Sequence, residues 1–460
     1  MISPPADIPP LLLRLMQAII LLTPLPLASN RPLFVGLLAC ACAIALLLWS
    51  LHLARTHKGM PIGWRQLALP AFPFSLFLLW SALQLVPFPP PLAHTAWQES
   101  APILMNSAPL GSISIDPAAT MAGILKLLSY AILFFLAVQI GHAPHQAAHL
   151  LKTIAVATSG YALYGLLIYA LGDQTLLWFV KRDYVGSLTG TFVNRGAFAA
   201  YCGMGFFVLA TLFLRTLCRE LETTRPARSP DVTAIYVLPR VWLLLSGAGL
   251  IFVALLLTNA RAGLASVLLA GAVYWLGLYT TRLLPRRLLL TLALLAATLT
   301  GLALTFHGDR LFARLEGSIM ARDERSEIWN VTARMIADAP LSGQGLGTYA
   351  HLYPTYRSEN LQMTYTQAHN TYLEMAAELG LPATALWLFA LLALGIRLLI
   401  GVATRRINQL YPLLALVVLT QAALHSLLDF SFQIPANAGL LAILLGLGYA
   451  QSFRRQEQPL

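Results

Sequence analysis

The sequence predicts an all-α, polytopic membrane protein with about twelve transmembrane helices and one mainly helical domain outside the membrane. The 460 residues are 58% hydrophobic and 11% charged, with a mean hydropathy of +0.69, whereas soluble domains carry roughly 25% charged residues. Several apolar runs exceed the ~18 residues that can cross a bilayer. One long connection, residues 307–380, separates the ninth run from the tenth.

The apolar runs are interpreted as spans in the order in which they follow along the chain. The first run contains Pro24 and Pro26 and ends in "LASN", so a cleaved signal peptide is an alternative to a first span. No Lys or Arg precedes Arg14, which favours the span. The predicted spans are near residues 11–28, 33–52, 66–86, 118–141, 148–171, 196–214, 241–258, 262–280, 288–306, 381–401, 410–427 and 437–452.

The distribution of basic residues predicts the orientation. If both ends of the chain are cytoplasmic, the inner connections carry sixteen Lys and Arg residues and the short outer connections carry five. This is the positive-inside bias of membrane proteins. The bias, together with attraction to anionic lipid headgroups, accounts for the net charge of +11. We therefore expect membrane lipids as partners and no nucleic acid. The four cysteines form no pair in an outer connection, so neither a disulfide framework nor a zinc site is predicted.

The first part of the 307–380 connection predicts an amphipathic helix. Ile328, Val331, Met335, Ile336 and Ala339 recur at helical spacing, and Pro340 ends the pattern. We expect the apolar face to rest on the spans or at the membrane surface. Three glycines follow and predict a tight turn: Gly343, Gly345 and Gly347.

The second part contains "TYTQAHNTYLEMAAELGLP", residues 364–382, with one histidine, His369. Thr371 and Glu374 fit a capping box, with Thr371 as the N-cap of a short helix near residues 372–379. Gly380 fits the position after its last turn, and Pro382 fits a stop. His369 would then lie beside a helix N-terminus, which disfavours an imidazolium and keeps the ring competent as a base. A satisfied structural histidine is the alternative.

Three arginines are the second signal. Arg195 stands in "GTFVNRGAFAAYCGMG" at the outer mouth of the sixth predicted span, and Arg261 in "LLLTNARAGLASVLL" lies in a two-span hairpin with almost no connecting loop. Arg325, in "RDERSEIW", comes from the outer domain. Charged residues in or at a bilayer are costly and usually functional. The alternatives are snorkelling for Arg261 and an ion pair with acidic neighbours for Arg325.

A neutral histidine and arginines at an outer membrane face suit the transfer of a sugar from a polyprenyl pyrophosphate. Bidentate arginines stabilise the departing pyrophosphate without a metal. The neutral histidine takes the proton of the acceptor hydroxyl. A groove among the spans would accept the polyprenyl tail.

These motifs resemble the O-antigen ligase family, which groups O-antigen ligases with related bacterial polysaccharide polymerases and protein O-oligosaccharyltransferases. "AHNTYLEMAAELGLP" resembles its His-Asn segment, "TNARAG" its span-entry arginine motif, and "RSEIWNVTARMIADAPLSGQGLGTY" the start of its large periplasmic loop. After "GTFVNR" many members continue with Asn-His, where this chain has Gly196 and Ala197, and Ala383 fits the segment after the loop only loosely.

The resemblance implies a GT-C-like glycosyltransferase in the bacterial inner membrane that acts on the periplasmic side. It implies an undecaprenyl-pyrophosphate-linked glycan donor, lipid A–core or another glycan as acceptor, and neither metal nor cofactor. His369 takes the place of the family's essential histidine, Arg195 and Arg261 take the places of its pyrophosphate-binding arginines, and Arg325 is a further candidate for that role.

Three functions stay open at this point. A ligase would join the glycan to lipid A–core, whereas a polymerase or a protein O-oligosaccharyltransferase would use another acceptor. An anion transporter is the alternative of another class, although the chain has no internal repeat of the kind that many transporters show. The predicted domains are residues 1–306 (spans 1–9), 307–380 (periplasmic domain) and 381–460 (spans 10–12 and a cytoplasmic tail).

Overall fold

The structure is a computed structural model of the whole chain. It describes residues 7–89, 93–99, 110–172, 174–223, 230–284, 286–287, 289–290, 301, 318–357, 364–405 and 407–453. For residues 220–223, 230–238 and 318–324 it describes the backbone only.

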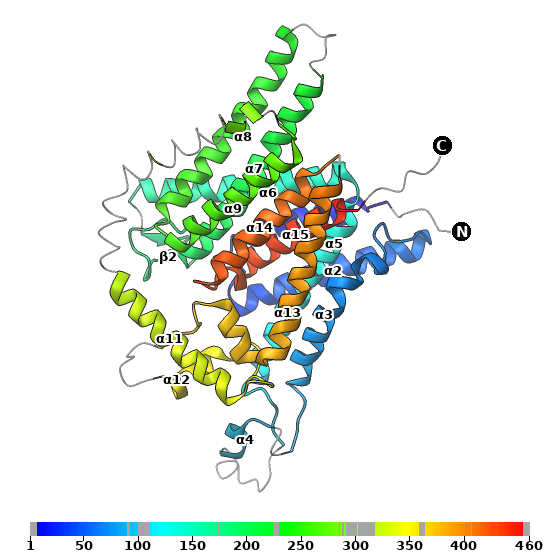
Figure 1. Ribbon diagram of the computed structural model, residues 1–460. Helices are drawn as coiled ribbons and strands as arrows, with labels where there is room; N and C mark the ends of the chain where they lie inside the picture. Colours follow the sequence, from blue (N-terminus) through cyan, green and yellow to red (C-terminus); the bar gives the residue numbers. More distant parts are fainter. Residues whose placement is uncertain are drawn as a thin grey trace.

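Nearly all of the described secondary-structure elements are helices (Figure 1). The α-helices are α1 (Pro10–Leu22), α2 (Pro32–Thr56), α3 (Trp64–Leu83), α4 (Thr95–Glu99), α5 (Pro117–Gly141), α6 (Pro144–Ala170), α7 (Arg195–Thr223), α8 (Pro230–Leu257), α9 (Arg261–Thr281), α11 (Ser318–Asp338), α12 (Tyr349–Tyr356), α13 (Thr371–Thr404), α14 (Leu410–Ser426) and α15 (Pro435–Gln451). Two short 3-10 helices, Leu27–Ser29 and Ser431–Gln433, and a small antiparallel hairpin of β1 (Thr175–Leu176) and β2 (Phe179–Val180) complete the described elements.

The helices confirm an all-α polytopic membrane protein. Eight described helices are long and apolar enough to cross a membrane: α2, α3, α5, α6, α7, α8 from Pro239, α9 and α13. Three predicted spans correspond to shorter helices, which are α1 with 13 residues and α14 and α15 with 17 residues each. The predicted span near 288–306 lies outside the described residues, apart from three positions, so the total of twelve stays a prediction.

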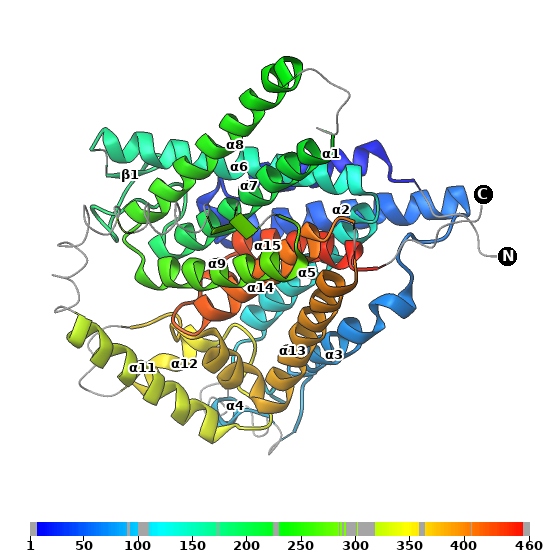
Figure 2. The same ribbon diagram turned by 45° about the horizontal axis from the view of Figure 1, so that its top comes forward.

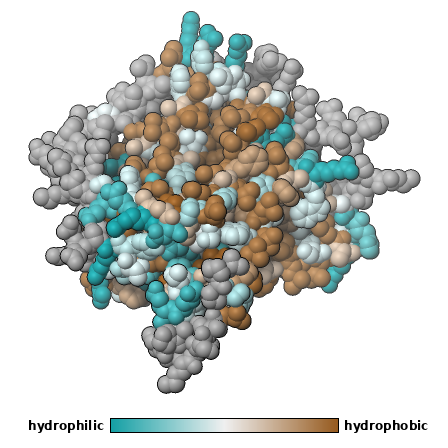
Figure 3. Space-filling model, turned by 60° about the horizontal axis from the view of Figure 1, so that its bottom comes forward, coloured by the Kyte–Doolittle hydropathy of each residue, from teal (hydrophilic) through white to brown (hydrophobic). Residues whose placement is uncertain are grey.

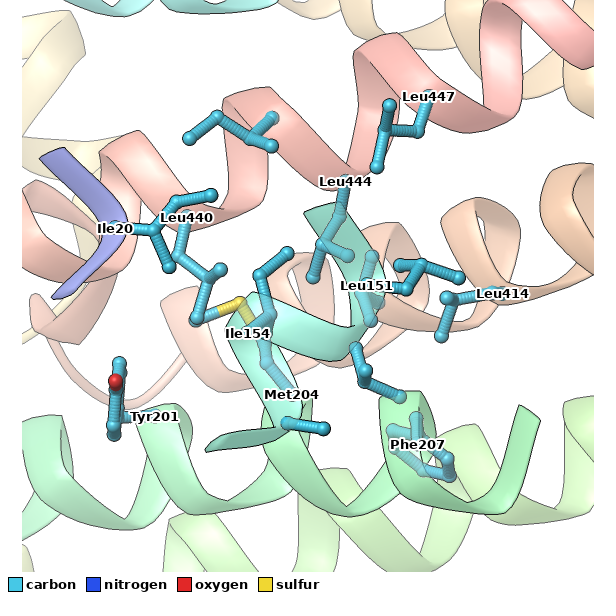
Figure 4. Close-up of a cluster of buried hydrophobic side chains, with 14 of the residues drawn as sticks. Ile20, Leu151, Ile154, Tyr201, Met204, Phe207, Leu414, Leu440, Leu444 and Leu447 are labelled. Atoms are coloured by element: carbon cyan, nitrogen blue, oxygen red, sulfur yellow. The ribbon is translucent and has the colours of Figure 1, made fainter. Parts of the chain in front are cut away.

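Two helices form the centre of the bundle. In α7, 83% of the residues in its most apolar stretch are buried, against 17–39% in the other long helices. In α15, every residue except Leu441 is buried as well. Figure 4 shows Tyr201, Met204 and Phe207 of α7 directed toward Leu440 and Leu444 of α15, with Ile154 of α6 between them. The other long helices surround this pair and expose apolar side chains outward, as a lipid-facing surface requires. Hydrophobic residues cover much of the middle of the face in Figure 3.

One end of the bundle carries α11 and α12, and the two termini lie at the other end (Figures 1 and 2). Ile328, Val331 and Met335 of α11 are buried, which confirms the predicted amphipathic helix. This apolar face packs on α12, on the loop before α13 and on the first turns of α13. The buried residues that it contacts are Tyr349, Leu352, Tyr353, Ala368 and Ala377. The division of the chain at residues 306 and 380 stays a prediction.

Helix α13 consists of two helical segments that meet at Gly380. Gly380 has φ +79° and ψ 163°, which interrupts the helix where the sequence predicted its end. Gly343, in the predicted glycine turn, packs against this kink, and a Cβ on it would lie 2.3 Å from the carbonyl oxygen of Glu378. Gly343, Gly345 and Gly347 all have positive φ, which confirms the turn. Pro382 does not end the helix, because it stands in the first turn of the second segment, where its missing N–H costs nothing.

The predicted capping box is wrong. The N-cap is Asn370, whose side-chain oxygen accepts hydrogen bonds from the N–H groups of Tyr372 and Leu373 at 3.0 and 3.1 Å. Thr371 is already helical, and its hydroxyl donates to the carbonyl of Asp429. Both Asn and Thr are good caps, so the local pattern could not choose between them.

Candidate functional site

Four segments far apart in the sequence meet at the end of the bundle that carries α11 and α12. They are the start of α7, the start of α9, the loop before α13 and the loop after α14. Contacts with Asp429 and His425 join three of these segments directly. The first two turns of α9 reach His425 through Gly263 and Ser266. This is the end predicted to hold the site.

His369 lies in the loop before α13, with its backbone in the left-handed region at φ 51°. Such a conformation is uncommon for a residue other than glycine and is held by its surroundings. The imidazole is flanked edge-to-face by Phe430 and Tyr365, with ring centroids 5.2 and 6.3 Å away, and its side chain is 24% exposed. Nδ1 lies 3.9 Å from Oδ1 of Asp429. Within the described parts of the chain, the ring makes no hydrogen bond.

Burial lowers the pKa of His369 below its ordinary value of 6.5. Asp429 opposes this shift because its negative charge favours the imidazolium, and the positive charge of Arg325 adds to it. The net direction is down, so the ring is neutral at pH 7. A neutral imidazole with one nitrogen near a carboxylate can accept a proton from a hydroxyl group.

Asp429 is the centre of a buried polar network. Its Oδ2 accepts a hydrogen bond from the Ser431 hydroxyl at 3.0 Å and lies 3.3 Å from Nε2 of His425. Its Oδ1 accepts from the N–H of Phe430 at 2.8 Å. Burial raises the pKa of Asp429, but the contacts with His425 and Phe430 and the nearby His369 outweigh burial, and the pKa is lowered overall. Asp429 is therefore an anion beside His369.

His425, in the last turn of α14, has no exposed surface and a partner at each ring nitrogen. Nδ1 lies 3.2 Å from the hydroxyl of Ser266 in α9, and Nε2 lies 3.0 Å from the hydroxyl of Ser431. The network thus joins α9, α14 and the loop after α14. It holds the Asp429 side chain in the orientation in which its carboxylate faces His369.

Gly196 leaves room for the Asp429 carboxylate. Asn194 accepts hydrogen bonds from the N–H groups of Gly196 and Ala197 at 2.6 and 3.2 Å, and so begins α7. A Cβ on Gly196 would lie 2.2 Å from Oδ2 of Asp429. The glycine in place of the Asn of many family members is therefore required by the position of Asp429 in this chain.

The three predicted arginines lie at this end of the molecule, in different settings. Arg195 is the first residue of α7, and its guanidinium lies over the ring of Tyr184, 5.2 Å from the centroid. Arg325, in α11, is exposed, and its charge acts on both His369 and Tyr184. Arg261 is the first residue of α9 and is half-buried. Two residues further on, Gly263 approaches Cε1 of His425 and Ala199, so the first turn of α9 lies against the network. Convergence of the three guanidinium groups on one ligand stays a prediction.

Glu374 ties the His369 loop to α13. Its buried carboxylate accepts a hydrogen bond from the N–H of Ala368 at 2.8 Å, and the side chain of Gln433, from the loop after α14, lies beside it. One turn on, the carboxylate of Glu378 accepts from the N–H groups of Gly347 and Tyr349 at 2.7 and 3.0 Å. These two carboxylates hold the glycine turn and the His369 loop on the same helix.

Among the described residues, no group of three or more His, Cys, Asp or Glu is arranged to hold a metal ion. The expectation of a metal-independent reaction is not tested by this arrangement and stays a prediction.

The fold and the site together indicate a multi-pass membrane protein that has a histidine, a carboxylate and several arginines at one end of its helices. Residues 246–388 match the family model Wzy_C, which is described as O-antigen ligase. The matched residues include α9, α11, α12 and His369. This part of the chain therefore matches the O-antigen ligase family, and the resemblance predicted from the sequence is confirmed. The family implies glycosyltransferase activity of the ligase or polymerase type. No curated protein matches the sequence.

The site residues predicted from the sequence do not include Asp429, His425 or Ser431. His425 was included in a predicted span, and residues 428–436 were regarded as a short connection. The signal was present, because two ionisable residues four positions apart at the end of an apolar helix are themselves evidence of a functional site.

Proposed function

We propose that this protein is a glycosyltransferase that moves an undecaprenyl-pyrophosphate-linked glycan onto lipid A–core at the periplasmic face of the bacterial inner membrane. The observation that supports this most is His369: a neutral imidazole without a hydrogen-bond partner among the described residues, 3.9 Å from a buried aspartate, at the end of the bundle that carries Arg195, Arg261 and Arg325. The positive-inside bias supports cytoplasmic termini and a periplasmic site.

In the proposed reaction, the acceptor hydroxyl attacks the anomeric carbon of the donor sugar while the bond from that carbon to the pyrophosphate oxygen breaks. The hydroxyl proton passes to His369. Because Nδ1 is the ring nitrogen nearest Asp429, Nε2 is the nitrogen that accepts the proton, and Asp429 stabilises the imidazolium that results. This is a positioning and electrostatic role for Asp429.

The pyrophosphate carries away the bonding electrons as negative charge. Arg195, Arg261 and Arg325 are proposed to stabilise that charge through charge-assisted hydrogen bonds, which are strong where water is scarce. Because arginine side chains can stabilise the anionic leaving group in place of a metal ion, we expect glycan transfer to continue in the presence of EDTA.

A deletion of the gene in its own bacterium, followed by gel analysis of the surface glycan, tests the acceptor. A ligase predicts that lipid A–core carries no glycan at all. A single unpolymerised unit left on the core would assign the protein as a polymerase, and an unchanged lipopolysaccharide with unglycosylated proteins would assign a protein O-oligosaccharyltransferase. Unchanged glycans of every kind would contradict the proposal.

A further inference from the structure

The hairpin between α6 and α7 exposes a group of large apolar side chains beside the site. Trp178, Phe179 and Val180 are 76%, 50% and 77% exposed, and Leu171 before them is 79% exposed. Solvent-exposed apolar patches of this kind mark contacts with a membrane or a partner. None of these side chains has a role in the proposed transfer.

The patch continues the outward face of α6. Val156, Leu163, Leu167 and Leu171 are all largely exposed, and their spacing of seven, four and four residues puts them on one side of the helix. Since α6 is apolar and long enough to span a membrane, this side is its lipid-facing side. The hairpin begins four residues after Leu171, where a chain that leaves the hydrocarbon region enters the headgroup region.

The composition of the hairpin suits that depth. Tryptophan and other aromatic side chains are enriched at the boundary between hydrocarbon and water, and the two residues that follow β2 are the cations Lys181 and Arg182. Arg182 is exposed. Cations just beyond an apolar tip complement the phosphates of the lipid headgroups.

Several hydrogen bonds hold the β1–β2 hairpin together and attach it to the helix bundle. Its strands pair with Thr175 opposite Val180, and Gln174 closes the base by accepting from the N–H groups of Lys181 and Gly186. Lys181 donates from Nζ to the carbonyl of Ser187, and the N–H of Leu188 donates to the carbonyl of Leu257 at the end of α8. The apolar tip is therefore held in place by the bundle.

We infer that the β1–β2 hairpin is a membrane-surface contact, in which Trp178, Phe179 and Val180 lie among the lipid headgroups and upper acyl chains. Tyr184 follows the hairpin and stacks on Arg195, so the hairpin holds Arg195 at the depth of the headgroup phosphates. If the proposed function holds, this is also the depth of the diphosphate of a lipid-linked donor, and the hairpin marks the side from which that donor enters.

Tryptophan quenching tests the membrane contact without any assay of transfer. The full chain is reconstituted in phosphatidylcholine nanodiscs with brominated acyl chains, and the emission of Trp178 is obtained as wild type minus Trp178→Phe. Trp242→Phe, on the lipid-facing side of α8 and 60% exposed, is the positive control, and Trp97→Phe, in α4 outside the spans, is the negative control. We expect brominated lipid to reduce the Trp178 emission roughly twofold, as for Trp242, with little quenching by iodide.

Quenching of Trp178 by iodide and not by brominated lipid would overturn the inference, because the tip would then lie in water. Protection from both quenchers would also overturn it, since a second protein copy would then cover the tip. The link to the donor has its own test: the double variant Trp178→Ser, Phe179→Ser should raise the apparent KM for the lipid-linked donor several-fold at unchanged kcat. Unchanged KM with positive quenching would reject the donor link alone, and absence of transfer in the wild type would reject the proposed function.

Discussion

Two histidines flank the same aspartate, and they are built differently. His425 is fully buried in a helix, and hydroxyl or carboxylate groups face both of its ring nitrogens. His369 is in a loop with a left-handed backbone, 24% of its side chain is exposed, and the described residues give its ring no hydrogen bond. Aromatic edges, rather than polar groups, surround it.

The difference between the two histidines supports His369, rather than His425, as the base of the proposed reaction. A buried polar side chain with all its hydrogen bonds made stabilises the fold, since leaving it unpaired would cost free energy. A partly exposed ring with an unused nitrogen, held in a strained conformation, is available to a substrate. His425 therefore orients Asp429, and Asp429 faces His369, the proposed base.

The largest effect expected from this comparison is at His369. His369→Ala should reduce glycan transfer by about 10²- to 10⁴-fold, the usual contribution of a general base, and leave the thermal unfolding temperature unchanged. Rates per folded molecule, measured with purified enzyme and lipid-linked donor, check this. His351→Ala is the control, because His351 is an exposed histidine of the same region, paired with Asp116, and should keep wild-type activity. Near-wild-type transfer by His369→Ala would remove it from the base role.

His425→Gln should show the opposite pattern. Loss of the buried partner leaves polar groups unpaired and should lower the free energy of unfolding by about 1–3 kcal/mol. The activity of the molecules that remain folded should fall far less than in His369→Ala. Thermal unfolding in detergent together with transfer rates separates the two quantities, and an equal loss of rate in both variants would contradict the division of roles.

Arg261→Lys is expected to cause a smaller loss of the transfer rate than His369→Ala. The lysine keeps the charge but cannot bind two phosphate oxygens in a plane, so the loss should be on the order of 2–3 kcal/mol, roughly 30- to 150-fold in rate. Arg282→Lys, at the other end of the same helix and exposed, is the matched control and should be silent. Transfer within threefold of wild type by Arg261→Lys would return Arg261 to a structural role.

Gly196→Ala should have a smaller effect, mainly on stability. The added Cβ would lie 2.2 Å from Oδ2 of Asp429, so the carboxylate must move away from His425 and Ser431 at a cost of about 1–3 kcal/mol. Gly160→Ala in α6 is the control, because nothing lies within 4 Å of its Cβ position. That variant should be neutral or more stable by up to about 1 kcal/mol. Equal unfolding temperatures for the two variants would show that Gly196 is not needed for room.

The fold was predictable because each element depends on neighbouring residues. Long apolar runs predict spans by length alone, and the spacing of Ile328, Val331 and Met335 predicted the buried face of α11. The glycine turn and the kink at Gly380 were also visible, since glycine is the residue that adopts positive φ without strain. The local sequence pattern did not decide which residue is the N-cap of α13, because Asn370 and Thr371 are equally suitable.

The site was only partly predictable. His369 and the arginines were recognisable because polar residues are rare in so apolar a chain. Asp429 was not assigned, because its importance arises from contacts with residues 60 and 233 positions away, His369 and Gly196. The spacing of His425 and Asp429 marks them as candidates, but it does not report which distant segments they contact. The glycine at position 196, noticed as a difference from many family members, is explained only by where the Asp429 carboxylate lies.

The acidic limb of the pH–rate profile tests most directly the claim that a neutral His369 accepts the proton. Burial and Arg325 lower the pKa of His369, and Asp429 raises it. A base works in its neutral form, so transfer should fall as pH drops through that pKa, below 6.5. Arg325→Gln removes a positive charge, raises the pKa and should move the limb of kcat/KM to higher pH. Asp429→Asn removes a negative charge and should move it to lower pH, and Arg325→Lys should leave it in place. Opposite shifts in the two variants are the predicted result, and limbs that stay together or move in the same direction would contradict the account.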